Sequence, residues 1–176
     1  MKRNMASALL VIVLAATFVV SMAATAKGAD SACSLARAAG TYGFSTNGTV
    51  IGVGPRVSAG IFTLDSTGNI TNGKATSSLN GAVAGETFAG AYTINPDCTG
   101  TFNNLEIRDL SANLLLTITA ALAWDDNMKH LRAIFTSATL PNGTSLPTAI
   151  SADATKQQDR GVPTERNAAG TKAGMY

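Results

Sequence analysis

The sequence predicts an all-β protein, a single antiparallel barrel of about eight strands with a short N-terminal helical segment and a cleaved signal peptide. Two observations predict the barrel. Turn sequences recur along the chain, and Asn-Gly pairs supply the positive φ values that tight hairpins need. Between the turns lie short runs in which apolar and polar residues alternate, as in half-buried strands. The expected turns are Asn47-Gly48, Asn72-Gly73, Asn80-Gly81, Asn142-Gly143 and residues 66–69.

The alternating runs each place their apolar side chains on one face of a strand. They are Tyr42 and Phe44; Phe62 and Leu64; Phe88, Tyr92 and Ile94; Leu105 and Ile107; Leu114, Leu116, Ile118, Leu122 and Trp124; Leu131, Ala133 and Phe135; and Ile150, Ala152 and Ala154. This spacing fits a barrel or a sandwich, and we favour the barrel because closure removes exposed strand edges. Segment 114–124 also fits helical spacing, but Thr117 and Thr119 favour a strand.

The N-terminus has the pattern of an export signal. Lys2 and Arg3 precede the uncharged apolar run 8–20, which a small-x-small cleavage sequence follows at 24–26. The run is short for a stable membrane span, so a signal peptide is favoured over a membrane anchor. The expected organisation is a signal peptide at 1–26, an N-terminal segment at 27–39, the barrel at 40–155 and a disordered tail at 156–176. The mature protein would then be secreted or periplasmic, with no stable membrane span.

Charge argues against nucleic acid as a partner. Removal of Lys2 and Arg3 with the signal leaves 11 basic and 11 acidic residues, so the mature chain is close to neutral. The barrel segment, residues 40–155, contains five basic and eight acidic residues, and the basic residues form no stripe. Binding to nucleic acid requires positive charge against the phosphates. The sequence does not indicate an oligomeric state.

The two cysteines, Cys33 and Cys98, predict a disulfide, because paired cysteines in an exported protein usually form one. The alternative is a redox pair or a metal site. The chain has no C-x-x-C sequence and a single histidine, His130, so neither a metal site nor a cofactor is expected.

Three motifs carry a resemblance to a known group of proteins. They are Gly40-Thr41-Tyr42, residues 63–69 with the pattern T-x-D-x-x-G-N, and residues 92–101 with the pattern Y-T-x-N-x-D-C-x-G-T. Over roughly residues 38–156 the chain resembles small exported bacterial β-barrel proteins of unassigned function. The resemblance implies a shape similar to the calycin and allene oxide cyclase-like barrels, and it implies no particular chemistry, because fold does not fix function.

No catalytic residues are expected. The densest group of titratable side chains, at 125–132 around His130, fits a solvated hairpin better than an acid–base site. A serine nucleophile would need a neighbouring base, and the G-x-S-x-G sequence is absent. Glu106 and Asp109 flank Arg108, which favours a solvated strand end over a pair of glycosidase carboxylates.

Aromatic residues provide the candidate binding site. Small eight-stranded barrels are either filled by side chains or hold one small ligand. The candidates for a ligand pocket are Tyr42, Phe44, Phe62, Phe88, Tyr92, Trp124 and Phe135, and the alternative is that they fill a packed core.

Three functions follow from these observations. The favoured one is a secreted, non-catalytic barrel that binds a small apolar ligand or serves as an envelope or extracellular structural module. The second is a barrel cyclase or isomerase, which needs few ionisable groups because it acts by positioning its apolar substrate. In that enzyme Tyr42, Tyr92 or Glu106 would steer the reaction. The third is a surface assembly or matrix protein.

Overall fold

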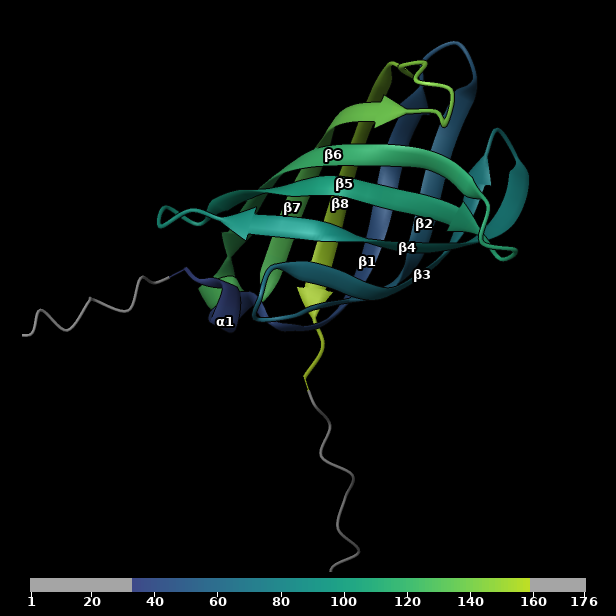
Figure 1. The fold of residues 1–176 in the computed structure, drawn as a ribbon. Helices are drawn as coiled ribbons and strands as arrows, with labels where there is room; N and C mark the ends of the chain where they lie inside the picture. The colour runs from purple at the N-terminus through teal and green to yellow at the C-terminus, as the bar shows by residue number, and fades with distance from the viewer. Residues whose placement is uncertain (1–32, 159–176) are drawn as a thin grey trace, which may run out of the picture. The chain divides into compact units, whose positions relative to one another are not determined.

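The strands form a closed antiparallel barrel in this computed structural model, which describes residues 33–158 (Figure 1). Each strand pairs with its neighbour in sequence, and β8 returns to pair with β1. The elements are α1 (Leu35–Ala38), β1 (Gly40–Val50), β2 (Gly54–Leu64), β3 (Asn69–Leu79), β4 (Ala82–Ile94), β5 (Thr99–Asp109), β6 (Leu114–Asp125), the 3-10 turn η1 (Asp126–Met128), β7 (His130–Thr139) and β8 (Thr148–Lys156). The predicted fold class is confirmed, including a strand in the ambiguous segment 114–124.

The two ends of the chain concern the predicted signal peptide and the predicted tail. The predicted signal peptide and most of the predicted tail, residues 159–176, lie outside the described residues. The last strand ends at Lys156, one residue beyond the expected end of the barrel. Between residues 33 and 158, no helix is both long enough and apolar enough to cross a membrane.

Two kinds of turn connect the strands. Asn80-Gly81 is the expected tight hairpin, with φ of 49° and 88°. Other turns are closed by an aspartate whose carboxylate accepts backbone N–H groups two or four residues ahead, as Asp65 does from Thr67 and Asn69. Asp97 and Asp109 do the same. The pKa of all three aspartates is lowered because hydrogen bonds stabilise the charged carboxylate, chiefly from the side chains of Thr99 and Asn113 at Asp97 and Asp109 and from the backbone of Asn69 at Asp65.

Two of the expected Asn-Gly turns are wrong, because both pairs lie inside strands. Gly48 lies in β1, where a Cβ atom would collide with the backbone of Ala149 on β8. Asn72-Gly73 lies in β3 at a β-bulge, and Asn72 takes a φ of 54°. The bulge lets Ile70 and Gly73 both face inward although three positions separate them. Gly48 therefore allows β8 to approach β1 closely, Asn72-Gly73 forms a bulge, and neither pair reverses the chain.

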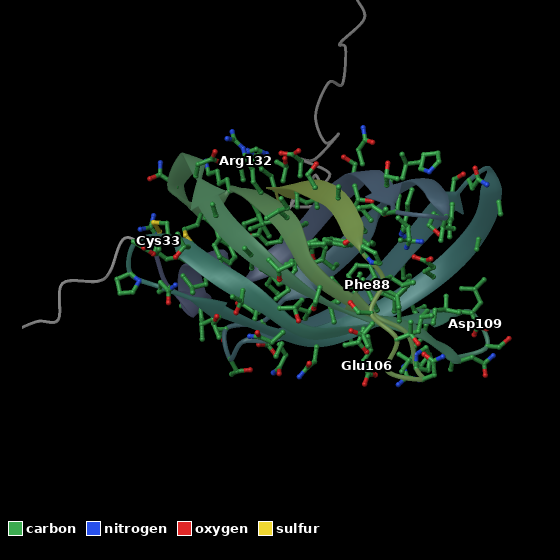
Figure 2. The ribbon with its side chains drawn as sticks, turned by 90° about the horizontal axis from the view of Figure 1, so that it is seen from above. Cys33, Phe88, Glu106, Asp109 and Arg132 are labelled. Carbon is green, nitrogen blue, oxygen red and sulfur yellow. A yellow bond between two sulfur atoms is a disulfide. The ribbon has the colours of Figure 1, made fainter. Side chains whose placement is uncertain are left out.

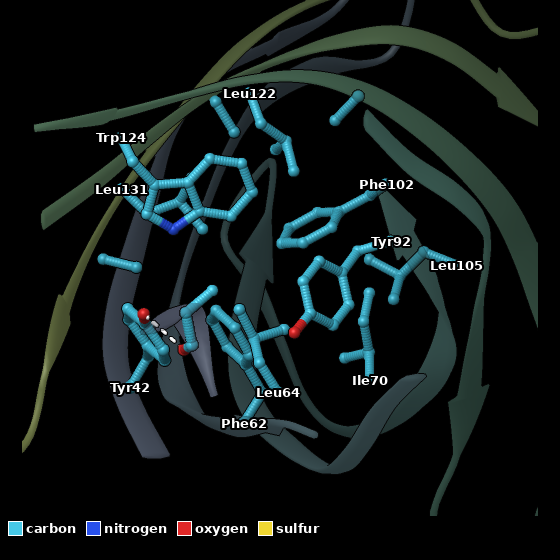
Figure 3. Packing of buried hydrophobic residues seen from close by; sticks show 14 of the residues in the cluster. Tyr42, Phe62, Leu64, Ile70, Tyr92, Phe102, Leu105, Leu122, Trp124 and Leu131 are labelled. Atoms are coloured by element: carbon cyan, nitrogen blue, oxygen red, sulfur yellow. Dashed lines mark hydrogen bonds between the residues drawn. The ribbon is translucent and has the colours of Figure 1, made fainter. Parts of the chain in front are cut away.

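Buried aromatic side chains and α1 fill the end of the barrel at which β1 begins. The hydroxyl of Tyr42, which is fully buried, donates to the backbone oxygen of Ala38 in α1 at 2.7 Å. The ring of Tyr42 stacks on Phe62 with centroids 5.4 Å apart. Tyr92 donates to the backbone oxygen of Asp65, and Trp124 packs against Tyr92 (Figure 3). A disulfide between Cys33 and Cys98 ties the start of α1 to the turn between β4 and β5.

Alkaline titration of the tyrosines should report the burial of Tyr42 and Tyr92 at this end of the barrel. Burial raises the pKa of Tyr42 and of Tyr92 to about 12, because the low-dielectric core disfavours a phenolate. The unfolded chain releases these protons near pH 10. Stability from both groups is therefore complete below pH ~10 and is lost as pH rises through ~12. We expect the tyrosinate absorbance of the native protein to rise later than that of urea-unfolded protein. Coincident curves would contradict burial, and Tyr42→Phe should remove one late-titrating group.

Candidate functional site

A cavity of about 60 Å³ lies inside the barrel and extends from Phe62, which stacks on Tyr42, to Arg56 and Glu86 further from α1. Its aromatic lining forms a continuous cluster in which Phe62 contacts Phe44, Phe88 and Phe102, with centroids 5.6 to 6.1 Å apart. Phe44 and Phe88 meet edge to face at 5.5 Å. Because Phe44, Phe88 and Phe135 are only half-buried, the cavity has apolar walls that solvent reaches.

Small side chains create the space. Ala75, Ala133, Ala152 and Ala154 line the cavity where larger residues would fill it. Strand alternation explains their positions, because Ala152 and Ala154 are two residues apart on β8 and therefore point to the same face. The sequence thus combines large aromatics on β1, β2, β4, β5 and β7 with alanines on β3, β7 and β8.

One wall of the cavity carries a buried ion pair. The Nη2 atom of Arg56 on β2 lies 2.7 Å and 3.0 Å from the two carboxylate oxygens of Glu86 on β4. Ser77 on β3, which lies between these strands, donates to Glu86 Oε1 at 2.8 Å. Arg56 is 9% exposed and Glu86 is 5% exposed. Both charges are therefore taken out of water, and their mutual attraction and hydrogen bonds must offset that desolvation.

A second pair of polar groups continues this wall. Thr46 on β1 and Ser58 on β2 are partners in the strand register, and their hydroxyl oxygens lie 2.7 Å apart. Both residues line the cavity. The polar groups come from β1 to β4, whereas the cavity residues of β5 to β8 are apolar. The site is therefore two-faced, with an aromatic and aliphatic body and one hydrogen-bonding wall.

Comparison with solved structures finds proteins of similar structure. No protein-family model matches the chain. No curated protein matches it either. The crystal structure of Rv2717c from M. tuberculosis is similar over 70% of this chain and 95% of that chain, with 11% sequence identity and a TM-score of 0.31. At this level of similarity no ligand or activity is transferred to this chain.

The structure divides the predicted pocket residues into two groups. Phe44, Phe62, Phe88 and Phe135 line the cavity together. Tyr42, Tyr92 and Trp124 are not among the lining residues and belong to the buried core drawn in Figure 3. Their position along the strands explains the division, since residue 42 lies near the start of β1 next to α1, whereas residues 44 and 46 lie further towards the other end.

The other titratable residues considered from the sequence lie away from the cavity. Glu106 is on the outer face of β5 and pairs with Arg108 at 2.6 Å (Figure 2). His130 lies at the α1 end of β7, where its ring contacts Asp125 at 2.9 Å and Asp153 at 3.3 Å. The hydroxyls of Tyr42 and Tyr92 donate to backbone oxygens. None of these groups is among the residues that line the cavity.

Arg56 and Glu86 form the most distinctive part of the site, and neither is among the pocket residues predicted from the sequence. A signal for both was present in the alternation of their strands. Glu86 is in phase with inward-facing Phe88, and Arg56 is in phase with inward-facing Phe62. A charged residue in phase with a buried apolar face indicates a buried charge, and buried charges are normally paired.

Proposed function

We propose that this protein is an exported, non-catalytic barrel that binds one small, largely apolar ligand in the cavity. The observation that carries the proposal is the set of half-buried phenylalanines, Phe44, Phe88 and Phe135, which line a space that the alanines leave unfilled. Binding pockets are typically apolar concavities with a few polar groups that orient the ligand. Covering these rings would remove apolar surface from water, which is the main driving force for such binding.

The size of the cavity limits the ligand. A cavity of about 150 Å³ lined by apolar residues holds benzene, and the space here is about 60 Å³. A one-ring ligand would therefore fill the cavity and extend into its mouth, or it would turn one of the half-buried rings aside. Larger ligands would need wider movement of the barrel.

The disulfide supports the exported location in this proposal. Cys33 and Cys98 are bonded, and disulfides persist mainly in oxidising compartments outside the cytoplasm. This agrees with the expected signal peptide at 1–26. The protein would therefore meet its ligand in the periplasm or outside the cell.

Filling the cavity should abolish binding. Native mass spectrometry of protein purified from its own host should show the added mass of one small molecule, which disappears on denaturation. Ala152→Phe places a ring in the cavity and should give the bare mass. The matched control is Ala149→Phe, which makes the same change on the exposed face of β8 and should keep the ligand. A bare mass for the unaltered protein, with no affinity for added one-ring hydrocarbons, would refute the proposal.

A further inference from the structure

Arg56 has hydrogen-bonding capacity that the protein does not use. A guanidinium carries five N–H donors on three nitrogens. Only Nη2 of Arg56 has a hydrogen-bond partner within residues 33–158, and that partner is Glu86. Nε and Nη1 are left with no protein acceptor, although the residue is nine-tenths buried and lines the cavity. Among residues 33–158 the buried side-chain atom without a partner is Nε1 of Trp124, so solvent reaches these Arg56 nitrogens, and they remain free to donate to an acceptor on a molecule that occupies the cavity.

Arg56 also lies where two spaces meet. It lines the main cavity and a smaller one of about 20 Å³, next to Leu146 and Ile150 near the mouth. The smaller space lies where β7 and β8 separate, because their pairing ends at Ile134 and Ser151. A ligand whose body lies among the phenylalanines could therefore present its polar end to Arg56 near the mouth.

The charge balance decides what kind of acceptor fits. Glu86 already neutralises Arg56, with oxygens at 2.7 Å and 3.0 Å from Nη2. Arg56 and Glu86 are the charged residues among those that line the cavity. An anionic ligand group would give this desolvated site a net negative charge beside the carboxylate of Glu86. A like charge that close is unfavourable in a low-dielectric environment. A neutral oxygen can accept from Arg56 without that repulsion.

We infer, on the basis of the proposed binding function, that the ligand is an uncharged amphipathic molecule whose carbonyl, ester, amide or hydroxyl oxygen accepts hydrogen bonds from Arg56. Its apolar ring or chain lies against Phe44, Phe88 and Phe135. The ion pair then serves recognition, because Glu86 fixes the guanidinium in place and cancels its charge. Ser77 also donates a hydrogen bond to Oε1 of that carboxylate.

Three one-ring probes of nearly equal size test this inference by calorimetric titration at neutral pH. Ethylbenzene has no acceptor, acetophenone has a neutral carbonyl oxygen, and benzoate is an anion. We expect acetophenone to bind about tenfold more tightly than ethylbenzene, because a hydrogen bond from a charged donor contributes that much to affinity. We expect benzoate to bind more weakly than acetophenone.

The double variant Arg56→Met/Glu86→Met tests the role of the pair. It removes both charges and keeps comparable volume, so acetophenone should lose its advantage while ethylbenzene still binds. The matched control Arg108→Met/Glu106→Met removes an exposed pair of the same composition, neither member of which lines the cavity. It should leave the preference unchanged.

The outcomes separate this inference from the function on which it rests. Equal affinity for ethylbenzene and acetophenone would overturn the inference and leave an apolar binding site. Tighter binding of benzoate would also overturn it, in favour of an anionic ligand. If the Arg56→Met/Glu86→Met variant still bound acetophenone more tightly than ethylbenzene, another group would be the donor, and the inference about Arg56 would be overturned. Failure of all three probes to bind would overturn both proposals.

Discussion

Replacing Glu86 with methionine is expected to lower the free energy of unfolding by about 3–5 kcal/mol, the usual cost of breaking a buried ion pair on one side. Arg56 would keep its charge in a site where it is 9% exposed, with no carboxylate to replace the lost hydration. Ser77 would lose its hydrogen-bond acceptor as well. Whole domains are stable by only about 5–15 kcal/mol, so this single change threatens folding. Urea denaturation followed by circular dichroism measures the loss.

Two further variants separate the broken pair from a general loss of packing. Arg56→Met/Glu86→Met removes both charges, and its stability should return to within about 1–2 kcal/mol of the unaltered protein, because a buried pair replaced by apolar side chains is often close to neutral. Glu106→Met breaks an exposed pair and should cost less than about 1 kcal/mol. If the Glu86 and Glu106 variants lose equally little, the pair around Arg56 is not desolvated as the structure indicates.

The alternation of apolar residues was enough to predict the barrel, because period-two alternation and turn chemistry are local properties of the chain. Where the sequence misled, a non-local contact was responsible. Asn47-Gly48 looks like a hairpin turn, but β8 passes so close to Gly48 that glycine is required inside the strand. Asn72-Gly73 has the composition of a turn and instead forms a bulge that keeps β3 in phase with its neighbours.

For a related reason, the sequence predicted only the aromatic residues of the site and not its ion pair. Phe44, Phe62, Phe88 and Phe135 are apolar residues that any barrel interior would bury. The meeting of Arg56 with Glu86 depends on the register of β2, β3 and β4, which places residues 30 positions apart in contact. That register is set by the bulges, and their positions could not be read from apolar alternation. Tyr42, Tyr92 and Trp124 have the same inward phase as the cavity residues and differ from them only in height along the barrel.

Loss of the disulfide is the other change with a large expected effect. Cys33 and Cys98 are separated by 65 positions. Closing a loop of that length stabilises a protein by roughly 4 kcal/mol in the chain-entropy model. We therefore expect Cys33→Ser/Cys98→Ser to lower the urea midpoint strongly. Reductant should do the same to the unaltered protein and should not affect the variant. Equal midpoints with and without reductant would contradict a stabilising role for the bond.

Unfolding caused by loss of the disulfide should begin at α1, because this helix of four residues cannot persist alone. It is held by the disulfide just before it, by the hydrogen bond from Tyr42 to Ala38 and by Lys156, which donates to the backbone oxygen of Arg37 at 3.0 Å. Hydrogen exchange at the amides of Ala38 and Ala39 should accelerate on reduction before the barrel strands exchange. No residue of α1 is among those that line the cavity, so ligand affinity should survive at urea concentrations where the variant remains folded. Simultaneous exchange of α1 and the cavity strands would instead mean that the disulfide stabilises the whole barrel as one unit.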